Sequence, residues 1–444
     1  IPAFKSGLSE SQLTSLCRLI ASPCPIKVLT GGPGTGKSTL LQVLVKAFDD
    51  LPNRHLDFRF AAPTGKAAKV VKGKLDQIES SHESSTIHSL LQGGGRGSFE
   101  YGRNNRLSAD VLVVDESSMN DIEVTASLVE ALKEGAHIIF VGDPDQLPSV
   151  SPGRVLADLI ELGKEGLVEH CALTETHRNG GDLLAFIKSV ATGAASCADS
   201  ESVSFSHKLG EADVNFDEVM EDYLDMVKES GIEQVAFLLA HRQGKGDVAG
   251  WNVEYANSRI RERVNPDGEA VGSTSYRVND RIIIRQNKKT EDDQRVVNGD
   301  TGTLVSFETK AGGNGVKTIQ VRLDDGREVC ISGDEFEEMD LAYALSVHAS
   351  QGSEFKDVMF VCPRASKGFA NRPILYTAAS RAKSRLHVYG DDVEIRRMSS
   401  MDPLPRRSGL VGRVRALREQ MAEADGPRAD IDGGGDVELD RPSA

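Results

Sequence analysis

The sequence contains no hydrophobic run that could cross a membrane. A bilayer span needs roughly 20 consecutive apolar residues, and no run in the chain approaches that length. The chain begins at Ile1 rather than methionine, and its first residues carry no basic stretch followed by an apolar one. We therefore expect neither a membrane nor a secreted protein. We place it in the cytoplasm, associated with the nucleoid if the host is bacterial, and expect that a preceding region has been lost.

Paired cysteine spacing is also missing. The six cysteines, at positions 17, 24, 171, 197, 330 and 362, are scattered, and none stands in a C-x-x-C pair. This pattern favours buried thiols in a reducing compartment over disulfides or zinc.

The chain lacks the excess of positive charge that is typical of nucleic-acid-binding proteins, since its net charge is −15. About half of that charge comes from residues 199–229, which hold ten acidic residues against two lysines. The remainder of the chain is therefore free to form a basic groove for a phosphate backbone. We expect the acidic segment to be the solvent-exposed face of a helix and linker. The alternative is a surface that repels DNA.

What the chain does contain is a glycine loop between a strand pattern and a helix pattern. Residues 31–39 read GGPGTGKST, after the strand-like run 26–29 and before a periodic apolar segment at 40–45. Glycines let successive backbone N–H groups wrap round phosphate oxygens. Lys37 supplies an ammonium for the β and γ phosphates, and Ser38 offers a hydroxyl to Mg²⁺. The run predicts a site for a nucleoside triphosphate.

A second element of that site follows a buried strand pattern. Four apolar residues at 111–114 end in Asp115 and Glu116, which is the Walker B arrangement. In this interpretation Asp115 reaches the metal through water, and Glu116 polarises the attacking water as general base. The alternative is an acidic turn after a core strand.

Two α/β units and a β-rich insertion are expected along the chain. Up to about residue 198, apolar strands alternate with helices, which predicts a parallel sheet with helices on both faces and ligands at the carboxyl ends of its strands. A second series without a P-loop covers 199–275 and 336–400. Between its halves, 276–335 carries short strands separated by Asn-Gly, Gly-Gly and Asp-Gly turns, which predict a small β-barrel.

Smaller features lie in a short insertion and at the end of the chain. Within 86–109, the stretch 93–106 places Phe99 and Tyr101 among arginines and reads as a hairpin. Residues 401–444 form a terminal segment in which apolar residues at 410, 414, 417 and 421 predict an amphipathic helix. Residues from about 425 onward are expected to be disordered.

A second α/β unit beside one nucleotide site is expected to contribute an arginine. Charge develops on the γ-phosphate oxygens during phosphoryl transfer, and a guanidinium from a neighbouring domain stabilises it. Arg381 is the first candidate and Arg178 the second. Either, taken alone, is more often a surface residue.

Eight motifs in order closely resemble the superfamily 1B helicases, and the RecD group within them. Between about residues 8 and 389 they read GGPGTGKST, AAPTGKAAK, TIHSLL, VVDESSM, GDPDQLPSVSPG, LTETHR, SVHASQGSEF and LYTAASRAK. The resemblance implies two RecA-like domains that hydrolyse ATP with Mg²⁺ while moving 5′ to 3′ along single-stranded DNA. It implies a 5′–3′ DNA helicase acting in DNA repair or recombination.

The same resemblance assigns residues to the ATP site. Gln12 matches the glutamine that reads adenine, and Gln146 the residue that senses the γ-phosphate and couples it to DNA. Arg178 and Arg381 match the two arginines on the triphosphate. The remaining nucleotide contacts are Gly32, Pro33, Gly34, Thr35, Gly36, Lys37, Ser38, Thr39, Gly352 and Glu354, with Ser38 and Asp115 at the metal.

DNA-facing residues follow from the same resemblance. Hydroxyls, backbone N–H groups and a lysine grip phosphates without reading sequence. The residues concerned are Pro63, Thr64, Lys66, Thr86, His88, Ser346, His348 and Ser350. The 276–335 barrel resembles the SH3-like subdomain of the family. The short insertion matches its duplex-splitting pin, with Phe99 and Tyr101 stacking on the last base pair, or else it is a mobile surface loop.

Departures from the family leave alternatives open. The N-terminal domain of the stand-alone relatives is missing, which fits a fragment or a minimal form, and no clustered carboxylates suggest a nuclease. We expect a monomer on single-stranded DNA and fork junctions, with repair or conjugation subunits as further partners. The alternatives are a DNA-stimulated translocase subunit that does not unwind, and a superfamily 1B motor that acts on RNA.

Overall fold

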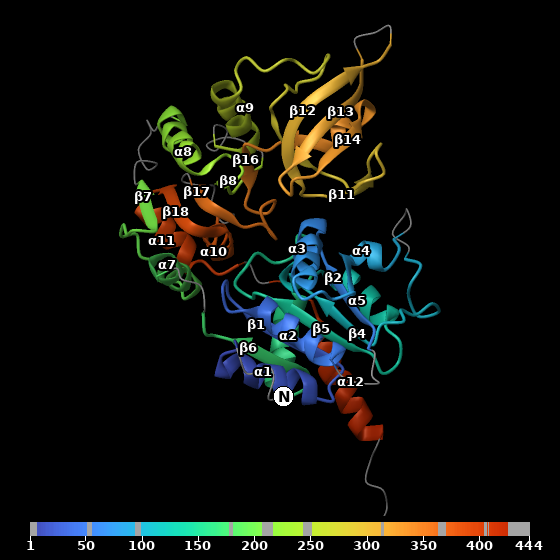
Figure 1. The fold of residues 1–444 in the computed structure, drawn as a ribbon. Helices are drawn as coiled ribbons and strands as arrows, with labels where there is room; N and C mark the ends of the chain where they lie inside the picture. Colours follow the sequence, from blue (N-terminus) through green and yellow to red (C-terminus); the bar gives the residue numbers. More distant parts are fainter. Residues whose placement is uncertain are drawn as a thin grey trace, which may run out of the picture.

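The computed structural model describes residues 7–50, 56–93, 99–176, 181–206, 216–242, 251–311, 315–362, 370–403, 406 and 408–424. Two α/β units lie side by side, and a β-rich unit sits over the first of them beside α3 (Figure 1). The fold expected from the sequence, two parallel sheets with helices on both faces, is confirmed.

The first unit contains a six-stranded, wholly parallel sheet in the order β3-β2-β4-β5-β1-β6. Its strands are β1 (Ile26–Gly31), β2 (Phe58–Ala62), β3 (Glu83–Thr86), β4 (Val111–Val114), β5 (His137–Gly142) and β6 (Glu169–Leu173). Its helices are α1 (Glu10–Ala21), α2 (Lys37–Asp49), α3 (Gly65–Asp76), α4 (Ile87–Leu90), α5 (Ile122–Ala131) and α6 (Val155–Lys164). Separate apolar clusters pack α1, α2 and α3 on one face, and α5 and α6 on the other. Both faces are therefore buried, as the continuous apolar strands predict.

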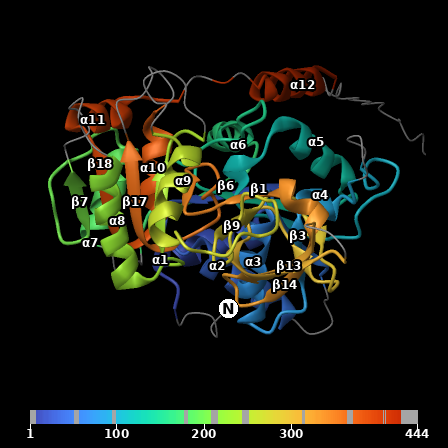
Figure 2. The ribbon, with the colours of Figure 1, turned by 90° about the horizontal axis from the view of Figure 1, so that it is seen from above.

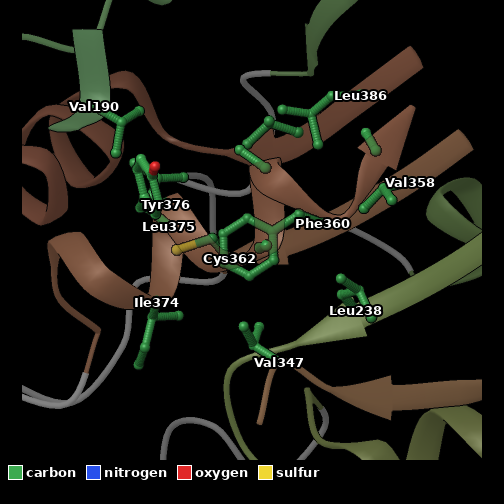
Figure 3. Packing of buried hydrophobic residues seen from close by; sticks show 14 of the residues in the cluster. Val190, Leu238, Val347, Val358, Phe360, Cys362, Ile374, Leu375, Tyr376 and Leu386 are labelled. Carbon is green, nitrogen blue, oxygen red and sulfur yellow. The ribbon is translucent and has the colours of Figure 1, made fainter. Parts of the chain in front are cut away.

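The second unit contains a five-stranded parallel sheet in the order β16-β8-β17-β18-β7. Its strands are β7 (Val203–Ser206), β8 (Val235–Leu239), β16 (Ala344–Ser346), β17 (Phe355–Cys362) and β18 (Ala382–Gly390). Its helices are α7 (Gly181–Ala191), α8 (Phe216–Ser230), α9 (Val253–Val264), α10 (Arg372–Ser380) and α11 (Asp392–Ser400). Figure 3 shows the cluster in which α7 and α10 meet the strands, with Val190 from α7, Leu375 from α10 and Phe360 from β17.

The position of α7 corrects the expected boundary between the two units. The sequence placed the end of the first unit at residue 198, but Leu183, Phe186 and Val190 of α7 are buried in the core of the second. The first unit therefore ends between β6 and α7. The alternation of strand and helix continues across this point, so the pattern alone did not mark it.

The β-rich insertion forms an antiparallel sheet with its own apolar core, in the order β14-β13-β12-β9-β15. Its strands are β9 (Arg281–Ile284), β12 (Thr301–Thr309), β13 (Val316–Leu323), β14 (Glu328–Ser332) and β15 (Met339–Leu341), with a separate ribbon of β10 (Lys288–Lys289) and β11 (Arg295–Val296). The insertion extends past the expected end at residue 335, because β15 pairs with β9. We call this unit the barrel after the expected architecture; its strand order runs from β14 to β15, and closure into an SH3-like barrel stays a prediction.

The barrel contacts α3 of the first unit directly. Lys69 lies 2.5 Å from Asp300 of the barrel, and a Cβ on Gly65 would stand 2.2 Å from the Cβ of Val297. Only a glycine at position 65 permits this approach. The barrel therefore contacts the helix that begins inside one of the expected DNA-binding motifs and carries Lys66.

The last described helix returns from the second unit to the first. Helix α12 (Leu410–Ala424) packs on α6, as Figure 2 shows. The predicted helix is confirmed, but its predicted apolar face is wrong in part. Val411 is buried and Val414 is partly buried against the core, whereas Leu417 and Met421 are 59% and 69% exposed. The residues from 425 onward, expected to be disordered, lie outside the described residues.

The expectation of buried thiols holds for only part of the cysteines. All six are free; Cys171, Cys197 and Cys362 are buried, whereas Cys17 is exposed and Cys24 and Cys330 are partly exposed. Among the described helices, none is long and apolar enough to cross a bilayer.

Candidate functional site

The glycine loop joins β1 to α2 at the carboxyl end of the first sheet. Gly34 and Gly36 have φ angles of 73° and 78°, a left-handed conformation that disfavours other residues. No side chain caps the N-terminus of α2, so its N–H groups face the loop. The Lys37 ammonium donates to the carbonyl oxygens of Gly31 and Gly32 at 2.6 and 3.1 Å. A phosphate group is a stronger partner for all of these donors.

The carboxylate pair stands where the Walker B pattern predicts, directly after β4. Glu116 has a φ of 52° and turns its side chain into the site. Burial raises the pKa of Glu116, and the neighbouring Asp115 raises it further, against the opposing charges of Arg381 and Lys37. A carboxyl group with a raised pKa is a stronger proton acceptor, which suits a general base.

A cavity of about 650 Å³ brings the predicted ATP residues together from both α/β units. From the first unit it is lined by residues 32–39, Asp115, Glu116 and Gln146, and from the second by Gly352, Glu354 and Arg381. This volume falls within the usual range for ligand sites. The Arg381 guanidinium is buried and donates to the carbonyl oxygen of Ser353 at 3.0 Å and the hydroxyl of Ser380 at 3.1 Å.

Gln12 lies beside the loop but is not among the residues that line the cavity. Its Oε1 accepts from the backbone N–H of Ser9 at 2.9 Å, and its Nε2 donates to the carbonyl oxygen of Thr35 at 3.0 Å. The Oε1 end thus caps α1, whose N-cap is Ser9, and the Nε2 end fastens this helix to the glycine loop. Arg178, the second predicted arginine, lies outside the described residues.

Lys74 is a cavity residue that the sequence reasoning missed. Its ammonium lies 2.5 Å from the hydroxyl of Ser38, the predicted metal ligand. Lys66, Val70 and Lys74 occur every four residues on α3 and all line the cavity. That helical spacing was the available signal.

A second cavity, of about 470 Å³, lies where the two α/β units meet the barrel. Pro63, Thr64 and His88 line it, together with Asn298 of the barrel and Gln351 of the second unit. Three predicted DNA contacts therefore line one cavity, which we call the groove. Residues 119–121 and 148–151, which the sequence reasoning did not assign to DNA, also line it.

Three other predicted DNA residues use their hydroxyls within the protein. Thr86 caps α4 by accepting from the N–H of Ser89 at 3.1 Å. Ser346 accepts from the N–H of Ala349 at 3.2 Å, and the buried Ser350 donates to the carbonyl oxygen of Val347 at 2.8 Å. In this structure, the three hydroxyl groups hold the conformation of the loops that surround the groove.

Lys66 and His348 are partly withdrawn from solvent. Burial lowers the pKa of the Lys66 ammonium, which lies 5.8 Å from the centre of the Phe355 ring and lines the 650 Å³ cavity rather than the groove. Burial also lowers the pKa of His348, and Arg406 lowers it further. The neutral form of His348 is therefore favoured.

The short insertion contains isolated antiparallel bridges in its described part, rather than the strands of a regular hairpin. Phe99 lies 5.7 Å from the ring of His88, and both Phe99 and Tyr101 are partly buried against the core of the first unit. Residues 94–98, between the two sides of the insertion, lie outside the described residues.

Comparisons with known families and proteins agree with this arrangement. The family model described as AAA domain matches residues 7–207, and that of the UvrD-like helicase C-terminal domain matches residues 341–389. The chain is 31% identical to the RecBCD enzyme subunit RecD of Mycolicibacterium smegmatis, over 93% of this chain and 76% of that protein. It is 28% identical to the ATP-dependent RecD2 DNA helicase of Deinococcus radiodurans, over 93% of this chain and 53% of that protein.

Solved structures show the same fold at lower identity. The Pif1 helicase from Bacteroides in complex with ADP-AlF3 and ssDNA superposes with a TM-score of 0.54 at 16% identity, covering 93% of this chain and 98% of that one. The Pif1 helicase from Candida albicans gives a TM-score of 0.54 at 20% identity, covering 93% and 99%.

Proposed function

The chain belongs to the RecD family of ATP-driven DNA helicases, and from that premise we propose that it moves 5′ to 3′ along single-stranded DNA and unwinds the duplex ahead of it. The cavity between the two α/β units is the observation that carries this proposal. It joins the glycine loop and Glu116 on one wall to Arg381 on the other. Bond cleavage at the γ-phosphate is therefore linked to the relative position of the two units.

The residues of the cavity fit ATP and Mg²⁺. Gly32, Gly34 and Gly36 line the cavity without side chains of their own, and Ser38 and Asp115 are the hard oxygen donors that would hold the metal. Mg²⁺ would neutralise charge on the β and γ phosphates. Glu116 accepts a proton from the attacking water, while Lys37 and Arg381 hold the phosphoryl oxygens from opposite walls.

Hydrolysis then drives stepping because both walls hold the same phosphate group. With the triphosphate bound, contacts from both units keep the cleft shut, and loss of the γ-phosphate removes the link between them. We propose that DNA lies across the groove lined by Pro63, Thr64 and His88, gripped through its phosphates. Binding is then independent of sequence and weakens with salt.

A translocase that does not unwind is the second candidate, and the insertion favours it. Phe99 and Tyr101 are partly buried against the core, so these two rings are not presented freely to a base pair. In that case the chain works as the motor subunit of a larger repair assembly. Exchange of both residues for alanine separates the cases, because it abolishes unwinding only if the rings split the duplex.

Translocation polarity tests the proposal without requiring unwinding. We expect ATP-dependent displacement of streptavidin from the 3′ end of a biotinylated DNA oligonucleotide and not from the 5′ end, and no displacement by Lys37→Ala. Displacement from the 5′ end alone would contradict the proposed direction. A matched RNA oligonucleotide that supports the same rate would favour an RNA motor.

A further inference from the structure

Tyr376 of the second unit reaches across the cleft to the loop that carries Gln146. We propose that Tyr376 is a positioning residue that, through Asp143, determines which end of the Gln146 side-chain amide is available to the ATP cavity. This inference rests on the proposed function of that cavity. Neither Tyr376 nor Asp143 was among the residues predicted from the sequence.

Three buried side chains form the link. The Tyr376 hydroxyl, on α10, donates to Oδ2 of Asp143 at 3.0 Å, and Nε2 of Gln146 donates to the same oxygen at 3.3 Å. Tyr376 is 2% exposed and Asp143 is 1% exposed, so water does not compete for these bonds. Within the described structure, Oε1 of Gln146 is buried and has no hydrogen-bond partner.

The chemistry of the carboxylate fixes the orientation of the amide. A carboxylate only accepts hydrogen bonds, so Asp143 must face the NH₂ end of Gln146. The end left for a ligand is then the carbonyl oxygen. A carbonyl repels phosphate oxygens but accepts a hydrogen from water, so Gln146 orients the attacking water for Glu116 rather than donating to the γ-phosphate.

The second unit also holds the end of this loop. The N–H of Leu147 donates to the hydroxyl of Thr377 at 2.9 Å, and Nε2 of Gln351 donates to the carbonyl oxygen of Leu147 at 3.2 Å. With the Tyr376 bond, three contacts from the second unit hold the loop on both sides of Gln146. Asp143 and Gln146 both belong to the first unit, so the second unit acts by holding this carboxylate and its loop in place, and it does so only while the two units are together.

Tyr376→Phe in the full chain is the primary test, because it removes the hydroxyl and keeps the ring that packs in the core (Figure 3). We expect kcat of the DNA-stimulated ATPase to fall roughly tenfold, the scale of a hydrogen bond to a charged group, while the KM for ATP stays within about twofold. Tyr276→Phe is the matched control, since its buried hydroxyl donates to the carbonyl oxygen of Met339 at 2.7 Å inside the barrel. It should leave both constants unchanged.

A double-mutant cycle with Asp143→Asn separates a relay from two independent effects. An asparagine can donate as well as accept, so it allows the Gln146 amide to turn over. If Tyr376 acts through Asp143, the double variant loses no more kcat than Asp143→Asn alone. The inference would be overturned if the loss of kcat in the double variant equalled the product of the two single losses. A Tyr376→Phe variant with wild-type kcat would also overturn it. A wild-type chain without DNA-stimulated ATPase would instead overturn the proposed function.

Discussion

Replacement of Arg381 by alanine tests the contribution of the second unit to catalysis. The guanidinium is 4% exposed and lines the same cavity as Lys37 and Glu116. An arginine supplied to the γ-phosphate in trans or in cis is worth roughly 10³- to 10⁵-fold in kcat. We expect a fall of at least about 10³-fold, which corresponds to about 4 kcal/mol of transition-state stabilisation.

The folded state should lose much less than the transition state. The guanidinium donates to the carbonyl oxygens of Ser353 at 3.0 Å and Thr377 at 3.2 Å. Without it, the Ser353 carbonyl loses its donor, whereas the Thr377 carbonyl keeps the Ser380 hydroxyl at 2.9 Å. One unsatisfied buried carbonyl costs about 1–3 kcal/mol. Thermal unfolding therefore shows a modest loss of stability, and the variant remains folded at assay temperature.

The assay is single-turnover hydrolysis with saturating single-stranded DNA, so that product release does not hide the chemical step. Arg381→Lys is the informative companion, because it keeps the charge but not the planar fork that reaches two acceptors. We expect it to recover only part of the rate. A fall of less than about tenfold in Arg381→Ala would refute a direct role for this residue at the γ-phosphate.

Three further predictions follow from the site and the barrel contact. The raised pKa of Glu116 means that kcat at saturating ATP falls as pH drops, with a midpoint above the ordinary glutamate value of 4.5; a flat profile through that range would contradict its role as base. Gly65→Ala pushes a Cβ into Val297 and should lower the free energy of unfolding by about 1–3 kcal/mol. Gly73→Ala on the same helix meets no atom within 4 Å and should raise it by about 0.5–1 kcal/mol. Equal effects of the two substitutions in denaturant titrations would contradict this account of the barrel contact. Lys74→Met removes an ammonium that must leave before a metal can bind, so the Mg²⁺ concentration for half-maximal ATPase should fall, and an increase would show that Lys74 instead supports the metal or the phosphates.

The sequence predicted the ATP site because its chemistry is local. The glycine loop, Lys37, Ser38 and the Asp115–Glu116 pair each sit at the carboxyl end of a strand, and a parallel sheet brings such ends to one edge. Motif order then added Gly352, Glu354 and Arg381 from the second unit. Residue-by-residue roles in this cavity remain proposals.

Contacts between distant segments were harder to foresee. Tyr376 reads as a core residue of a helix, and only the packing of the two units shows that its hydroxyl meets Asp143. The helix α7 continued the strand and helix rhythm, so nothing in its sequence marked it as part of the second unit. The apolar spacing of α12 predicted a helix but not that Leu417 and Met421 stay exposed, since packing on α6 ends earlier.

Strand separation on two matched duplexes tests the central claim most directly. The substrates share one sequence and differ only in carrying a 5′ or a 3′ single-stranded tail, and unwinding is followed with ATP and Mg²⁺. The account predicts unwinding of the 5′-tailed duplex alone. Unwinding of the 3′-tailed duplex alone would contradict it, and failure on both with DNA-stimulated ATPase intact would mean a translocase that does not unwind.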